Sequence, residues 1–265
     1  MKSVKAGLSE AVNGGNELAR AAPVIKGVLF DKDGTLIDFQ LTWGPAIHAV
    51  IHALANGDAD KLRAQAECLH FDIAERRFRA TSPIIGGSTA HYGMAWAAAL
   101  GRTDFLALRA EIDELAAVAC MDSLTPVGDP TLVCAALRRQ GLKIGLATND
   151  AEASARRHLR QLKLESWMDF VAGYDSGHGA KPAPGMVQAF AREIGAEPSE
   201  IALVGDTLHD LDCARAAGAT AIAALSGVAT REDLGPHADY VIADIGELPD
   251  LIASWGENGE APMQS

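Results

Sequence analysis

Short apolar segments alternate with helix-like segments over much of the chain, and this order constrains the fold more than any other feature. Segments with helical spacing of apolar residues include 129–140, 151–162 and 186–194. The apolar segments between and around them cover residues 28–30, 143–147, 170–172, 201–204, 220–223 and 240–242. Such alternation predicts an α/β fold with a Rossmann-like parallel sheet and helices on both faces.

The first apolar segment, 28–30, ends directly on Asp31-Lys32-Asp33-Gly34. Ligands of an open α/β sheet bind outside the carboxyl ends of its strands, so we expect these carboxylates in a ligand crevice. A turn at Gly34 can bring Asp33 back toward Asp31. A carboxylate nucleophile suits phosphoryl transfer, and a second carboxyl group can protonate the leaving oxygen and then activate water. For this segment alone, an exposed acidic turn or a calcium loop is the alternative.

Two further segments place polar side chains where an apolar segment ends. Thr148 and Asn149 follow the segment 143–147 and could hold a phosphate oxygen, although both residue types also cap helices. Lys181 precedes a proline between the segment 170–172 and the helix-like stretch 186–194. A cation fixed there would screen an aspartate nucleophile from phosphate, whereas a solvated surface lysine is the alternative.

A fourth segment, 201–204, is followed by Gly205-Asp206, and Asp210 comes four residues later. Spacing of four residues at the start of a helix puts the two carboxylates near one another. Carboxylates gathered around a hard cation are how proteins hold Mg²⁺. The alternative, acids favoured at a helix start by the macrodipole, explains each aspartate but poorly explains the cluster.

In type, order and position at strand ends, the four segments resemble the motifs of the haloacid dehalogenase-like (HAD) hydrolase superfamily. The resemblance covers residues from about 24 to about 254 and implies a catalytic role for three residues. Asp31 resembles the nucleophile, and Asp33 resembles the general acid and base. Lys181 resembles the lysine that neutralises phosphate and orients the nucleophile.

The same resemblance implies binding roles. Thr148 resembles the phosphate-binding hydroxyl residue of the second motif, with Asn149 beside it. Asp206 matches the acidic metal ligand of the fourth motif, and Asp210 matches its more variable companion, which is often bound through water. With Asp31, and with Asp33 through its backbone carbonyl, these two aspartates make up the ligand set expected for Mg²⁺.

Residues around the first motif narrow the expected activity. The dehalogenases and phosphonate hydrolases of the superfamily lack a second aspartate, so Asp33 argues against both. Thr35 favours phosphatases, since sugar phosphomutases resembling this pattern often have valine there. Lys32 departs from the apolar residue frequent at its position, and its side chain is expected to point away from the site.

The resemblance therefore implies a Mg²⁺-dependent phosphatase of the phosphoglycolate phosphatase-like group. Its substrate would be a small phosphomonoester, either phosphoglycolate or a sugar phosphate. Two alternatives stay open: a sugar phosphomutase of the same superfamily, and a non-catalytic binding or regulatory protein that kept the fold.

Between residues 40 and 124 the pattern changes to helices alone, with helical spacing over 43–54, 59–79, 89–100 and 104–120. The resemblance identifies this stretch as an all-helical cap that closes over the site, with hinges near 39–41 and 124–128. Residues 81–89 are expected to contact substrate, although Ser88 or Thr89 could instead cap the next helix. The expected division is a core of 23–39 and 125–255, the cap 40–124, and tails 1–22 and 256–265.

Histidines and cysteines outside the motifs suggest no second chemistry. His48, His52, His70 and His91 lack an HExxH arrangement and are interpreted as surface or core residues. His178 and His209 are close in sequence to Lys181 and Asp206, and they are better candidates for contact with the residues of the site. The scattered Cys68, Cys120, Cys134 and Cys213 are interpreted as isolated thiols of a reducing cytosol.

Charge and hydropathy exclude two classes of partner. The net charge of −12 argues against nucleic-acid binding. No segment approaches the roughly 20 apolar residues of a membrane span. The expected protein is cytoplasmic, a monomer or homodimer, and acts on a small phosphorylated metabolite.

Overall fold

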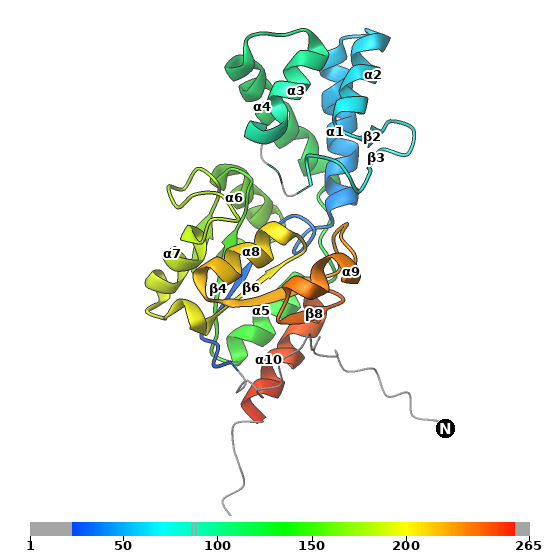
Figure 1. The fold of residues 1–265 in the computed structure, drawn as a ribbon. Helices are drawn as coiled ribbons and strands as arrows, with labels where there is room; N and C mark the ends of the chain where they lie inside the picture. Colours follow the sequence, from blue (N-terminus) through cyan, green and yellow to red (C-terminus); the bar gives the residue numbers. More distant parts are fainter. Residues whose placement is uncertain (1–22, 86, 88, 258–265) are drawn as a thin grey trace, which may run out of the picture.

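The computed structural model describes residues 23–257 except 86 and 88 (Figure 1). The predicted N-terminal tail, 1–22, lies outside the described residues, as does the chain after residue 257. The last helix, α10 (Leu248–Glu257), extends two residues into the predicted C-terminal tail.

A six-stranded parallel sheet forms the core, in the order β5-β4-β1-β6-β7-β8. Phe30 pairs with Leu146 of one neighbouring strand and Val204 of the other, so the chain leaves β1 in the middle of the sheet. The strands are β1 (Gly27–Phe30), β4 (Lys143–Ala147), β5 (Phe170–Ala172), β6 (Ile201–Gly205), β7 (Thr220–Ala224) and β8 (Tyr240–Ile242). All six were predicted from the apolar segments, and the predicted α/β fold class is confirmed.

Both faces of the sheet are covered by helices, which explains the nearly continuous apolar strands. Val28 and Phe30 of β1 pack on one side, and Leu29 packs on the other. The first side carries α5 (Pro130–Arg139), α6 (Glu152–Gln161) and α10. The second carries α7 (Gly185–Ile194) and α8 (Leu208–Ala217). The short α9 (Arg231–Leu234) and 3-10 turns at Glu165–Trp167, Pro198–Glu200, Gly235–His237 and Ile245–Glu247 complete the core.

The described part of the cap contains four helices and has a hydrophobic core of its own around Trp96, Leu108 and Ile51. Figure 1 shows it as a separate layer beyond the carboxyl edge of the sheet. Its helices are α1 (Phe39–Ala55), α2 (Ala59–Cys68), α3 (Thr89–Leu100) and α4 (Phe105–Ser123). The predicted helical insertion is confirmed, with one correction.

The predicted helix over 59–79 is wrong beyond Cys68, so the cap is not entirely helical. Its second part is a small antiparallel hairpin, β2 (Phe71–Asp72) and β3 (Arg77–Phe78). His70 and Arg76 adopt left-handed backbone conformations, with φ of 48° and 51°, which a helix cannot accommodate. The Phe71 and Phe78 rings pack 5.0 Å apart. Their spacing of seven residues also fits a helix, and this misled the prediction.

Two adjacent segments connect core and cap. The backbone amide of Asp38 donates to the Thr125 carbonyl at 2.8 Å, and that of Val127 donates to the Leu36 carbonyl at 3.0 Å. Asp38 caps α1 by accepting from the Leu41 amide at 2.8 Å. Residues 39–41, predicted as one hinge, lie in the first turn of α1.

In the described part of the chain, no helix is both long and apolar enough to cross a membrane. The four cysteines, all within that part, are free thiols.

Candidate active site

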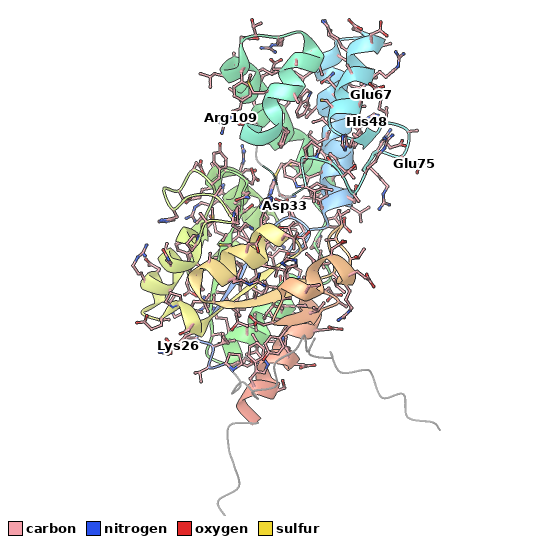
Figure 2. All side chains as sticks on the ribbon, in the orientation of Figure 1. Lys26, Asp33, His48, Glu67, Glu75 and Arg109 are labelled. Atoms are coloured by element: carbon pink, nitrogen blue, oxygen red, sulfur yellow. The ribbon has the colours of Figure 1, made fainter. Side chains whose placement is uncertain are left out.

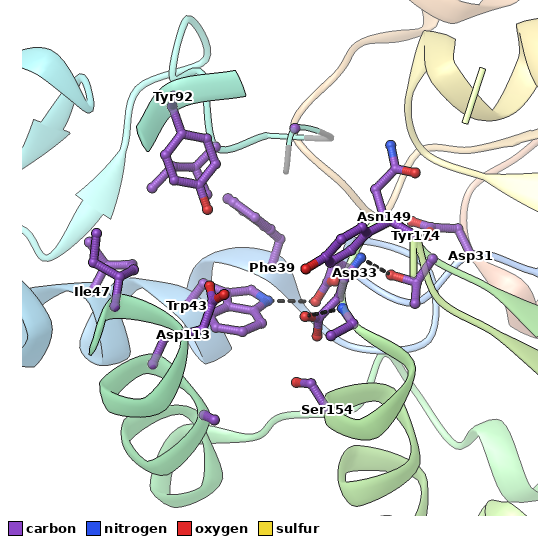
Figure 3. Close-up of a pocket in the computed structure, with 18 of the residues that line it drawn as sticks. Asp31, Asp33, Phe39, Trp43, Ile47, Tyr92, Asp113, Asn149, Ser154 and Tyr174 are labelled. Atoms are coloured by element: carbon purple, nitrogen blue, oxygen red, sulfur yellow. Dashed lines mark hydrogen bonds between the residues drawn. The ribbon is translucent and has the colours of Figure 1, made fainter. Parts of the chain in front are cut away.

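Four predicted segments meet in a pocket between the carboxyl edge of the sheet and the cap (Figure 3). Because β4, β1 and β6 are neighbours, the residues that follow them reach the same edge. The pocket is lined by five of the predicted site residues, namely Asp31, Asp33, Thr148, Asn149 and Lys181. Asp206 and Asp210 lie beneath it, in contact with this group.

Three buried carboxylates form the floor of the site. Asp31, Asp206 and Asp210 each place an oxygen within 4.8 Å of the others. Burial raises the pKa of Asp31 from 3.8 to about 7, with Lys181 opposing the rise and Asp210 adding to it. Burial, followed by the charge of Asp31, also raises the pKa of Asp206 well above its usual value. Both pKa values thus rise chiefly because burial disfavours a charged carboxylate.

Two glycines leave room for the Asp206 carboxylate. A Cβ atom on Gly227 would lie 1.8 Å from Asp206 Oδ2, and one on Gly34 would lie 2.1 Å from the same atom. Gly34 also has a φ of +88°, which favours glycine. The Thr35 hydroxyl donates to Asp206 Oδ1 at 3.3 Å. The turn after Asp33 is thus shaped around the carboxylate at the end of β6.

Lys181 lies between two of the carboxylates. Its Nζ is 2.5 Å from Asp31 Oδ1 and 2.5 Å from Asp210 Oδ1. Burial would lower the pKa of Lys181, but the charges of Asp210 and Asp31 outweigh burial and raise it. Asn149 fixes the backbone of Lys181: its Nδ2 donates to the Lys181 carbonyl at 3.0 Å, and its Oδ1 accepts from the Lys181 amide at 2.8 Å.

Asp210 and Thr148 differ in whether they support the start of a helix. Asp210 does support a helix start, since its Oδ2 accepts from the Thr207 amide and hydroxyl at 3.1 and 2.7 Å. Its other oxygen pairs with Lys181 and lies in the aspartate cluster, so the helix-start role does not account for all of its contacts. Thr148 does not cap α6, which has Ala151 at its N-cap. Its Oγ1 accepts from the Asp150 amide at 3.1 Å, beside the pocket.

Asp33 is held by two donors that the sequence did not reveal. Trp43 Nε1 donates to its Oδ1 at 2.5 Å, and Lys32 Nζ lies 2.8 Å from its Oδ2. Lys32 itself does not line the pocket, but its ammonium reaches two carboxylates that do, those of Asp33 and Asp150. Lys32 is 1% exposed and also contacts Asp150 and His158. A lysine within an apolar strand end was the available signal, because a buried ammonium needs charged partners.

Of the two histidines expected to contact the site, one lines the pocket. His209 lines the pocket, whereas His178 packs against the Phe170 ring at 6.0 Å. The rings of His48 and His52 lie 4.4 Å apart on α1. Within the described residues, the three aspartates are the group that could hold a metal ion. The side chain of His91 lies outside the description.

The cap supplies an apolar wall opposite the aspartates, visible in Figure 3. Its members are Phe39, Trp43, Ile47, Ile84, Tyr92, Ile112, Ala116 and Ala117. Of the segment 81–89 expected to contact substrate, Ile84 and Gly87 line the pocket, and residues 86 and 88 lie outside the described residues. Arg109 reaches from α4 to the hydroxyl of Tyr174 in the core, which links the two layers at the pocket.

Comparison with known proteins identifies the family. The sequence model of the haloacid dehalogenase-like hydrolases matches residues 25–218. The chain belongs to this family. A HAD family hydrolase from Deinococcus radiodurans R1, solved with bound phosphate and sodium, shares the fold with a TM-score of 0.63 and 21% identity. That match covers 89% of this chain and 97% of the other.

Among the relatives of this HAD protein that have named activities are two phosphatases. Phosphoglycolate phosphatase of Chromobacterium violaceum is 35% identical over 116 residues, which are 44% of this chain. The chain spans about half of that relative's own length, 51%. N-acetylmuramic acid 6-phosphate phosphatase of Pseudomonas aeruginosa is 27% identical over 232 residues, 86% of this chain and 95% of the relative.

Proposed function

We propose that this HAD protein is a Mg²⁺-dependent phosphatase that hydrolyses a small phosphomonoester through an aspartyl-phosphate on Asp31. One observation carries the proposal: three buried carboxylates, those of Asp31, Asp206 and Asp210, lie within 4.8 Å of one another. The Lys181 ammonium pairs with two of them, Asp31 and Asp210. The names of the two phosphatase relatives support the same reaction class.

The donor set fits a hard divalent cation. Carboxylate oxygens are the ligands that Mg²⁺ takes from proteins, usually one or two of them with water and substrate oxygens completing the shell. Asp31 and Asp206 would hold the ion, with Asp210 nearby and Asp33 contributing its backbone carbonyl. Bound Mg²⁺ would offset the negative charge of the transferring phosphoryl group.

Asp31 would supply the nucleophile. One of its oxygens forms a bond to phosphorus as the bond from phosphorus to the ester oxygen breaks. Lys181 holds the Asp31 carboxylate in place and opposes the rise in its pKa, so it favours the anion that attacks. Thr148 can donate its hydroxyl hydrogen to a phosphoryl oxygen, and Asn149 keeps Lys181 in register.

Asp33 would move the protons. As an acid it gives a proton to the departing alkoxide, which leaves as an alcohol. As a base it then takes a proton from the water that attacks the aspartyl-phosphate, so that inorganic phosphate is released and both aspartates return to their initial states.

The pocket favours a sugar phosphate over phosphoglycolate. The described cap residues that line it are aromatic, aliphatic or small, apart from the acidic Asp113 on α4. An apolar cap wall with one carboxylate suits a neutral, hydroxyl-bearing carbon skeleton, whereas the carboxylate of glycolate would meet like charge on the cap side. The arginine of the pocket, Arg157, belongs to α6 of the core.

The test is release of inorganic phosphate from a panel of phosphomonoesters, with Mg²⁺ or with chelator, by wild type and Asp31→Asn. The proposal predicts Mg²⁺-dependent release that Asp31→Asn abolishes. Isomerised sugar phosphate without stoichiometric phosphate would identify a mutase instead. Binding of phosphate esters without any turnover would indicate a non-catalytic protein.

A further inference from the structure

Lys32 lies at the centre of a buried polar cluster that the proposed reaction does not yet use. Its Nζ is 2.8 and 3.0 Å from the two carboxylate oxygens of Asp33, 3.0 Å from Asp150 Oδ2 and 3.1 Å from His158 Nδ1. The Trp43 ring lies beside it, with its centroid 5.2 Å from Nζ. We call these residues, Lys32, Asp33, Asp150, His158 and Trp43, the Lys32 cluster.

The hydrogen bonds of His158 are satisfied by other buried residues. Burial and the neighbouring ammonium lower the pKa of His158 to about 4, so its imidazole is neutral. An ammonium can only donate, so Nδ1 accepts from Lys32 and the ring proton sits on Nε2, which faces the Cys120 sulfur at 3.0 Å. His158 therefore accepts a hydrogen bond from Lys32 and helps to fix the position of its ammonium group.

Lys32 also screens two carboxylates from each other, those of Asp33 and Asp150. Asp33 and Asp150 both approach its Nζ, and without this ammonium two partly buried carboxylates would face each other unscreened. In this arrangement Asp33 is a carboxylate, with Lys32 near both oxygens and Trp43 donating to Oδ1. In the acid form Oδ2 would carry the proton for the leaving oxygen, and Oδ1 would still accept from Lys32 and Trp43. This arrangement selects one orientation of the Asp33 side chain at the pocket (Figure 3).

We propose that Lys32 is a positioning residue, which holds the Asp33 carboxyl group where it can transfer a proton to the leaving oxygen of the substrate. This inference rests on the proposed phosphatase function. It adds a role for Lys32, the residue between the two motif aspartates. Loss of Lys32 should lower kcat/KM most for a substrate whose leaving group needs a proton.

The experiment compares kcat/KM for two esters, p-nitrophenyl phosphate and an alkyl phosphate. This parameter covers the steps up to departure of the leaving group, before water attacks. The nitrophenolate leaves without protonation, whereas an alkoxide needs the acid. Lys32→Met should lower kcat/KM for the alkyl ester by about 10-fold or more, within the roughly 10²–10⁴-fold that general acid catalysis contributes. For the nitrophenyl ester the loss should stay below about 3-fold.

Three matched variants complete the design. Lys26→Met changes an exposed lysine that directly precedes β1, at the opposite end of this strand from Lys32, and should have no effect on either ester (Figure 2). Asp33→Asn should show the same leaving-group pattern more strongly. Adding Lys32→Met to Asp33→Asn should then cost little more, because the residue through which Lys32 acts is already lost.

A loss by Lys32→Met that is equal for both esters, or that adds fully to Asp33→Asn, would overturn the proposal. If Lys32→Met does not fold, His158→Asn decides, since it removes the imidazole that accepts from Lys32 without changing the charge. We expect a loss of about 3-fold confined to the alkyl ester, and an equal loss on both esters would again contradict the role. Failure of wild type to hydrolyse either ester would instead refute the proposed function, and the role of Lys32 with it.

Discussion

The ammonium nitrogen of Lys181 lies 2.5 Å from a carboxylate oxygen of Asp31, although 150 residues separate the two in the chain. Both side chains are nearly inaccessible to solvent. The contact couples the residue proposed as the nucleophile to a cation whose loop is held by Asn149. Removal of one partner would leave a buried charge without its counterion.

Lys181→Met should therefore lower kcat for phosphomonoester hydrolysis by at least about 100-fold, a size typical for loss of a group that stabilises charge in the transition state. The matched control is Lys143→Met, which removes an ammonium from an exposed lysine on β4. Steady-state phosphate release measures both. Near-native turnover by Lys181→Met would contradict the assigned role.

Gly227→Ala tests the space around Asp206. The added methyl group would fall 1.8 Å from Asp206 Oδ2, so this carboxylate must move. We expect turnover to fall by at least about 100-fold, with an increase in the Mg²⁺ concentration needed for half-maximal activity. Gly235→Ala is the control, because its new Cβ would meet nothing nearer than 3.9 Å. A fully active Gly227→Ala enzyme would argue against a metal site at Asp206.

Stability should depend on pH and Mg²⁺ together. Without a cation the pKa of Asp31 is raised from 3.8 to about 7. Between these values the folded state binds a proton that the unfolded state has released. The free energy of unfolding therefore falls as pH rises, by at most about 1.4 kcal/mol per pH unit for this group. Mg²⁺ binds the carboxylate form and should reverse the loss.

The measurement is thermal unfolding with Mg²⁺ or chelator at about pH 5 and about pH 8, at which the bound proton is present or absent. Mg²⁺ should raise Tm by several degrees at the higher pH and by much less at the lower. In Asp31→Asn the dependence of this shift on pH should weaken. An equal shift at both pH values would contradict the raised pKa.

The cap wall should determine which leaving group is accepted. Ala116→Lys places a cation in the wall and should raise kcat/KM for phosphoglycolate relative to a neutral sugar phosphate by about 10-fold, a modest fraction of one close charge pair. Val118→Lys adds the same charge to an exposed position of the same helix and should leave this ratio unchanged. Equal changes in both variants would show that net charge, and not the wall, affects selectivity.

The sequence predicted the six strands and the aspartate cluster because both follow from local pattern. A parallel strand that is buried on both faces reads as an apolar segment, and residues directly after such strands meet at one edge. The strand-end position of Asp31, Thr148 and Asp206 is a local pattern, and the family resemblance joins the three residues in one site. The family resemblance added Lys181, whose loop position alone is ambiguous.

Contacts that depend on how distant segments pack were missed. Lys32 and His158 are 126 residues apart, and no local pattern pairs them. The hairpin at 71–78 was missed because its aromatic spacing also fits a helix, while left-handed residues such as His70 carry no glycine signal. The apolar wall depends on the placement of the cap over the sheet, and hydrophobic periodicity does not predict that placement.

The central claim is that Asp31 carries the phosphoryl group, and trapping that group tests it most directly. Asp33→Asn lacks the base for the second step but can still be phosphorylated by p-nitrophenyl phosphate, whose leaving group needs no acid. After acid quenching and proteolysis, mass spectrometry should find phosphate on the peptide that contains Asp31, and none when Asp31→Asn is added. Turnover with no phosphorylated peptide, or with phosphate on another residue, would contradict the account.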